Sequence, residues 1–169
     1  MAVDLTLKST AIANRQATPR VLNNPGLGVG ARERAAYGVL ASVPAALSAT
    51  SVIRMVSVPS NCIIMSLMES SGAQTAGVAD IGVYRTNDDG GAVVDADFFG
   101  SLVSLAAATV NVDVLNESTT NTLVKQGQPL WQALGMTVDP RSSLDICFTI
   151  TTDITTGLQP LALRVRFVV

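Results

Sequence analysis

Four aspartates crowd around a glycine pair and are the residues of this chain with the clearest capacity for chemistry. Asp88 and Asp89 precede the pair, and Asp95 and Asp97 follow it. Oxygen-rich loops can hold calcium, but no Glu occupies the twelfth position that an EF-hand loop requires. Two carboxylates could also cleave a glycosidic bond, although four Phe, one Trp and two Tyr offer little for a sugar-stacking cleft. We favour a solvated turn followed by a helix cap.

The chain contains no histidine. This removes Ser-His and Cys-His nucleophiles and the common zinc and non-haem iron sites. The run GLGVG (26–30) lacks the spacing, the preceding strand and the Lys-Ser/Thr of a phosphate-binding loop. Cys62 and Cys147 lie in apolar, strand-like runs, which indicates buried thiols, with a disulfide as the alternative. We therefore expect a protein that is not an enzyme and that needs no cofactor or metal.

Composition points instead to assembly. Charged residues make up 14% of the 169 residues, against roughly 25% in an average soluble protein. A surface with so few charges is usually covered by subunit contacts, so we expect a homo-oligomer, with a hydroxyl-rich secreted monomer as the alternative. No apolar run is long enough for a membrane span, and the N-terminus lacks the apolar core of a signal peptide. We expect synthesis and retention in a cytosol.

Charge is distributed unevenly along the chain. Residues 1–36 hold five basic and two acidic residues, a net charge of +3, so the remainder carries −5. The same segment contains the turn-rich run NNPGLGVG and no sustained periodicity, which predicts an extended arm over 1–36 and a folded domain over 37–169. The basic residues are too scattered, and the body too acidic, to predict nucleic-acid binding.

The arm has two interpretations, which the sequence leaves open: it grips an adjacent subunit or shell, or it runs irregularly over its own domain. In the first interpretation, arginines would face an acidic partner surface, and apolar side chains would contribute as much because exposed ion pairs are weak. The expected contact residues are Arg15, Arg20, Val21, Leu22, Leu27, Arg32 and Arg34.

Beyond the arm, short runs rich in Val, Ile and Thr alternate with clusters of Gly, Pro, Asn and Asp. They predict strands at 51–58, 62–69, 78–84, 92–94, 110–115, 121–126, 144–152 and 161–169. Helical spacing of Phe98, Leu102 and Leu105 predicts a short helix near 96–107, and PLWQALG predicts one helical turn. We expect Trp131 of that turn to anchor the core, with an exposed binding hot spot as the alternative. Together, these strands and short helical segments predict a mostly β protein that folds as an antiparallel, jelly-roll-like β-sandwich.

Several of these stretches together resemble head decoration (cement) proteins of tailed bacteriophages. They are NNPGLGVGARERAAYGVL, VADIGVYRTNDDGGAVVDADFF, SLVSLAAA, and PLWQALG followed by a final strand pair. The resemblance implies a virion structural protein on the outer surface of the capsid. It also implies self-association, with a trimer favoured and a dimer possible, and the major capsid protein as partner. A minor tail component or a receptor-binding, adhesin-type module is the alternative function.

Overall fold

The computed structural model describes residue 19 and residues 32–169, and about half of these residues lie in eight strands that form two sheets. Their bounds are β1 Glu33–Leu40, β2 Val52–Pro59, β3 Ile63–Ser71, β4 Val78–Arg85, β5 Val93–Ser104, β6 Thr109–Asp113, β7 Ser143–Thr152 and β8 Leu161–Val168. One helical turn, α2 (Leu130–Ala133), and one 3-10 turn, η2 (Asn87–Asp89), interrupt them. Among the described residues, no helix has the length and apolar character needed to cross a bilayer.

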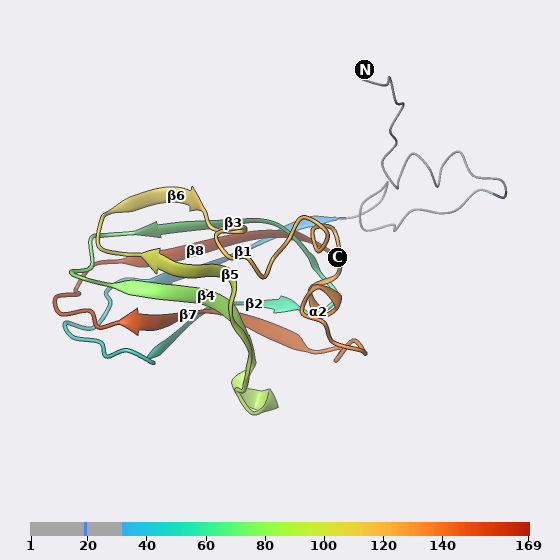
Figure 1. The fold of residues 1–169 in the computed structure, drawn as a ribbon, viewed down its shortest axis with the longest axis horizontal. Helices are drawn as coiled ribbons and strands as arrows, with labels where there is room; N and C mark the ends of the chain where they lie inside the picture. Colours follow the sequence, from blue (N-terminus) through green and yellow to red (C-terminus); the bar gives the residue numbers. More distant parts are fainter. Residues whose placement is uncertain (1–18, 20–31) are drawn as a thin grey trace, which may run out of the picture. The chain divides into compact units, whose positions relative to one another are not determined.

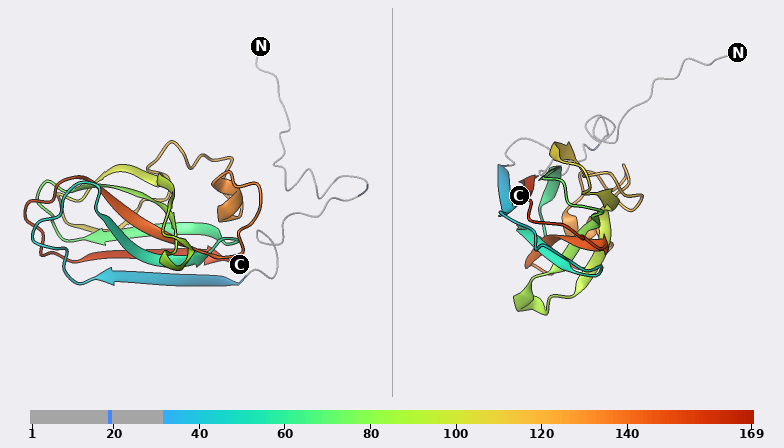
Figure 2. Two further views of the ribbon diagram at one scale, coloured as in Figure 1. Left: turned by 90° about the horizontal axis from the view of Figure 1, so that it is seen from below. Right: turned by 90° about the vertical axis from the view of Figure 1, so that its left-hand side faces the viewer.

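The strand order defines a jelly roll. One sheet runs β1-β8-β3-β6 and the other β2-β7-β4-β5, with every neighbouring pair antiparallel. Successive strands alternate between the sheets up to β4, and then β5 pairs with β4 before the chain returns to the first sheet. Figures 1 and 2 show the two sheets as facing layers. The predicted mostly β, jelly-roll-like sandwich is confirmed.

Alternation along the strands builds the core between the layers. In β8, Leu161, Leu163 and Val165 are fully buried, while Arg164 and Arg166 are exposed on the outside. Inward-facing residues of the opposite sheet, among them Ile81 and Phe148, close the core from the other side. This period of two is the pattern that predicted β8 from the sequence.

The helix predicted near 96–107 is wrong: residues 96–104 belong to β5, and the next three residues lie in the connection to β6. Ile81 of β4 pairs with Gly100 of β5, and Val83, two residues later, pairs with Asp95. Five residues of β5 therefore span the same distance as two residues of β4, so β5 carries a large bulge. The bulge puts the consecutive residues Phe98 and Phe99 both inside. Phe98, Leu102 and Leu105 have the spacing of a helical face, but Leu102 is 67% exposed while the other two are buried.

The sequence predicts an arm over 1–36 and no strand within it. β1 begins at Glu33, so residues 33–36 belong to the sheet and not to an arm that ends at residue 36. Small residues make this strand hard to recognise from the sequence. Gly38 must be a glycine, because a Cβ at this position would lie 2.1 Å from the carbonyl oxygen of Met55 in β2. The strand predicted at 121–126 is also wrong, since this stretch consists of turns.

Two of the predicted turns are present in the structure. Gly90 and Gly91 have φ values of 78° and 65°, as expected for the predicted Asp-Gly and Gly-Gly turn. The predicted helical turn after Pro129 is α2, but its core contacts come from Leu130 and Ala133, while Trp131 is only half-buried.

Candidate interaction surfaces

The expected contact residues of the arm fall mostly outside the described part of the chain. Arg15, Arg20, Val21, Leu22 and Leu27 are among the residues the structure does not describe. The remaining two, Arg32 and Arg34, are exposed, and Arg34 lies on β1 opposite Phe167 of β8. The structure therefore brings Arg34 onto the sandwich itself.

The outer face of the sheet β1-β8-β3-β6 carries a row of side chains that crosses all four strands. Strand register places Tyr37 opposite Arg164, Arg164 opposite Met68, and Met68 opposite Asp113. We call these four residues the cross-strand row. Tyr37 is 67% exposed, and Arg164 and Asp113 are exposed as well, whereas Met68 is half-buried between them.

Small and apolar residues surround the cross-strand row. Val39 is 56% exposed one pair along β1, and its partner in β8 is Ala162, which faces Ser70 of β3. Tyr37, Met68, Ser70 and Ala162 line a shallow hollow on this face together with Arg164. An aromatic ring and a methionine among small side chains are typical of protein contact surfaces, which are enriched in these residues.

Part of the outer face of the other sheet carries a network of polar side chains around Arg54. Arg54 of β2 lies 2.8 Å from a carboxylate oxygen of Asp145 in β7, and Asp145 also accepts a hydrogen bond from Ser57. Arg54 further donates to the carbonyl oxygens of Arg85 and Gly91, so it ties β2 to β7 and to both ends of the loop after β4. This network is intramolecular and leaves Asp145 only 7% exposed.

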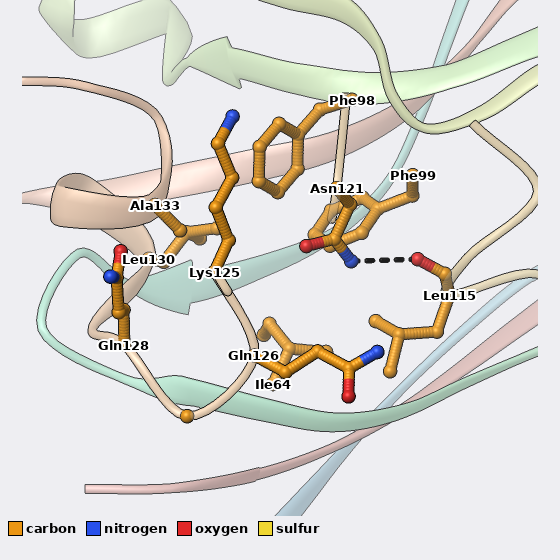
Figure 3. A pocket seen from close by; sticks show the side chains of 11 residues that line it. Ile64, Phe98, Phe99, Leu115, Asn121, Lys125, Gln126, Gln128, Leu130 and Ala133 are labelled. Atoms are coloured by element: carbon orange, nitrogen blue, oxygen red, sulfur yellow. Dashed lines mark hydrogen bonds between the residues drawn. The ribbon is translucent and has the colours of Figure 1, made fainter. Parts of the chain in front are cut away.

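A hollow at one end of the sandwich is too small for a ligand. Figure 3 shows Lys125 beside the ring of Phe98, with its Nζ 5.2 Å from the ring centroid, and Asn121 donating to the carbonyl of Leu115 at 2.8 Å. The cavity there measures about 20 Å³, against roughly 300–1,000 Å³ for typical ligand pockets. It has space for about one water molecule. The turn over 117–128 thus serves as a cover for the core.

The four aspartates around the Gly90-Gly91 turn do not form one site. Asp88 and Asp89 lie on η2, which projects from the sandwich in Figure 1, and Asp89 forms a 2.7 Å ion pair with Arg85. Asp95 and Asp97 are half-buried on β5. Burial, reinforced by a side-chain hydrogen bond that the protonated Asp95 carboxyl donates to Asp97, raises the pKa of Asp95, while a hydrogen bond from the backbone N–H of Asp97 opposes the rise. No group of three or more acidic or thiol side chains suited to a metal ion occurs within the described residues.

Both cysteines are buried and free, as predicted. Burial raises the pKa of each thiol to about 12, with a backbone hydrogen bond opposing the shift at Cys62 and the Arg54 charge opposing it at Cys147. A thiol of such a high pKa forms almost no thiolate at neutral pH and is a poor nucleophile. These cysteines contribute packing.

Comparison with known proteins gives one informative likeness. No family model matches the chain, and no curated protein matches its sequence. Among solved structures, a chain of the cyanophage Pam1 capsid asymmetric unit is similar, with a TM-score of 0.52 over 91% of this chain and 96% of that chain. The sequences are 12% identical over this match, so the likeness shows a shared fold. The alignment spans nearly all of both chains, which makes the two similar in size.

Proposed function

We propose that this chain is a non-catalytic structural protein of a phage virion that binds the outside of the capsid and stabilises it. The likeness to a chain of a capsid assembly, over nearly the full length of both, is the observation that supports this most. The exposed apolar face around the cross-strand row fits the same role, because a protein that works by contact needs a surface to offer.

A decoration protein would act by adding contact area to a completed shell. Any partner that binds the folded or assembled state stabilises that state by mass action, so a shell covered with this chain should melt at a higher temperature than a bare shell. Self-association would reinforce this effect, because a linked set of subunits binds several shell sites at once.

We propose further that residues 1–36 supply part of the shell contact through their basic and apolar side chains. Three of their arginines, Arg15, Arg20 and Arg32, would face acidic patches of the partner. Salt screens exposed ion pairs, so binding that depends on these residues should weaken as the ionic strength rises.

The test uses particles that lack the chain, to which the purified protein is added back. The full chain should bind at high occupancy and raise the melting temperature of the particle. The full-length variant R15Q/R20Q/R32Q should bind more weakly and lose most of the salt dependence, while R141Q, which changes an arginine outside residues 1–36, serves as a matched control. Unchanged occupancy and melting with the triple variant would remove the arm's role, and no binding by the full chain would remove the proposed function.

A further inference from the structure

The cross-strand row is complementary to itself. Arg164 and Asp113 lie on the two strands that flank β3, and each pairs in register with Met68. Neighbouring strands are about 4.8 Å apart, so the cation and the carboxylate sit at about equal distances on opposite sides of the Met68 position. A surface with this arrangement can meet an identical surface with each charge opposite its counterpart.

We propose that two copies of this chain pair through the outer faces of their β1-β8-β3-β6 sheets, about a twofold axis that runs along β3 at Met68. Rotation about an axis in the plane of contact exchanges the two flanks of β3. Arg164 of each copy then faces Asp113 of the other, and Met68 packs on Met68. The contact is isologous and closes with two subunits, in contrast to the threefold arrangement that the resemblance implies.

Other axes fail on charge. An axis along β8 would set Arg164 against Arg164 of the second copy, and an axis midway between β8 and β3 would set Arg164 against Met68. Juxtaposed like charges disfavour a contact, and a buried cation without a partner costs more still. Only the axis along β3 places both charges of the row in ion pairs.

Both charged residues are available for this contact. Within the described part of the chain, the guanidinium of Arg164 has no acidic partner, and its hydrogen bond to the side chain of Asn111 is long, at 3.3 Å. Asp113 accepts one hydrogen bond, from the backbone N–H of Leu115 at 3.0 Å. Arg166, the other outward arginine of β8, is by contrast already paired with Glu33 in its own chain.

The neighbours of Met68 permit close approach. Ala162 and Ser70, one pair along the strands, are small, so the two sheets can reach the separation of about 10 Å that is usual for stacked sheets. With the axis along β3, three strands of each copy (β8, β3 and β6) face the other copy, while β1 extends beyond the overlap. At the usual strand spacing and rise, they offer about 300–400 Å² per copy, less than the roughly 800 Å² of a standard interface. We therefore expect a dimer in equilibrium with monomer at micromolar concentrations.

The inference deepens the proposed function by naming its self-association surface. The experiment is sedimentation analysis of the full chain from about 1 μM to about 1 mM, at low and high salt. We expect a monomer–dimer equilibrium that salt weakens. R164D and D113R should each weaken association about tenfold or more, since each replaces two attractive pairs with two repulsive ones.

Two experiments that restore the ion pairs distinguish loss of this contact from misfolding of a variant. The double variant R164D/D113R restores both pairs with the charges exchanged, and should dimerise within about threefold of the original chain. An equimolar mixture of R164D and D113R should form a heterodimer, because the introduced aspartate of one copy then faces the introduced arginine of the other, and the second pair keeps its original residues. R141D, a charge reversal outside the sheet, should dimerise normally, and circular dichroism checks that every variant is folded.

Several results would overturn the proposal: a monomer throughout the concentration range, a trimer, association that R164D leaves unchanged, or a double variant and mixture that both stay monomeric. None of these would touch the proposed virion role, which add-back to particles measures separately. Conversely, a dimer with the expected charge dependence would stand even if the chain failed to bind particles.

Discussion

Arg54→Ala should be among the most destabilising single changes on the surface of this protein. The Arg54 side chain is 26% exposed and that of Asp145 only 10% exposed, so the ion pair between them is largely withdrawn from water. Removing the guanidinium would leave Asp145 with the hydroxyl of Ser57 and no cation. It would also leave two backbone carbonyls without the donor that now reaches them.

The expected cost follows from that environment. Breaking a fully buried ion pair by deleting one partner costs about 3–5 kcal/mol, because the other charge stays buried and unpaired. Solvent reaches about a quarter of Arg54, which lowers the figure, so we expect R54A to reduce the free energy of unfolding by about 2–4 kcal/mol. The double variant R54A/D145A should be less destabilised than the sum of the single variants, since it buries no lone charge.

Urea unfolding, followed by circular dichroism and by the fluorescence of Trp131, measures these differences. R141A is the matched control, because it removes an exposed arginine outside both sheets that forms no ion pair among the described residues, and it should change the free energy of unfolding by less than about 0.5 kcal/mol. If R54A were as mild as R141A, or if the R54A and D145A effects simply added, the network would not couple the strands.

Three further outcomes are expected. Gly82→Ala should lower the melting temperature and cost about 1–3 kcal/mol, because its Cβ would lie 2.2 Å from the backbone of β5; an unchanged melting temperature would contradict that close approach. Ser60→Ala should raise the pKa of Asp139 in a carboxyl NMR titration. Hydrogen bonds from the Ser60 hydroxyl and the backbone N–H of Arg141 lower that pKa in the folded protein. The ionised carboxylate therefore stabilises the fold at pH values above the ordinary pKa of Asp, and this stabilisation is lost as the pH falls through the lowered pKa. The stability difference between S60A and the original chain should therefore shrink in acid, and a constant difference would show that Ser60 acts otherwise. Finally, the buried thiols should react with a thiol reagent only as fast as the protein unfolds, and rapid labelling of the native protein would contradict their burial.

The sequence predicts the fold well where strands alternate regularly. Leu161 to Val168 shows one buried and one polar face, and the structure places it as β8 in the middle of a sheet. The sequence fails where bulges and small residues break that pattern. Phe98 and Phe99 are both buried by the bulge in β5, and Gly38 sits where any side chain would collide with β2. Such features depend on the neighbouring strand, which local periodicity does not contain.

The candidate contact surface could not be predicted from the sequence, because it also depends on which strands are neighbours. Tyr37, Arg164, Met68 and Asp113 come from four separate strands, and only the sheet order and register bring them into one row. The signal that could have pointed to it is the pair of arginines on the outward side of β8, an unusual place for charge in a chain with so little of it. The buried Asp145 was similarly hidden inside an apolar run.

We propose that this chain is a structural component of a phage head, and a density map of the intact particle, with the copy number of the chain counted by mass spectrometry, is the direct test. We expect hundreds of copies on the outer surface of the head, each showing the eight-stranded sandwich. A handful of copies at the tail would favour the receptor-binding alternative, and absence of the chain from the purified particle would contradict the proposed role.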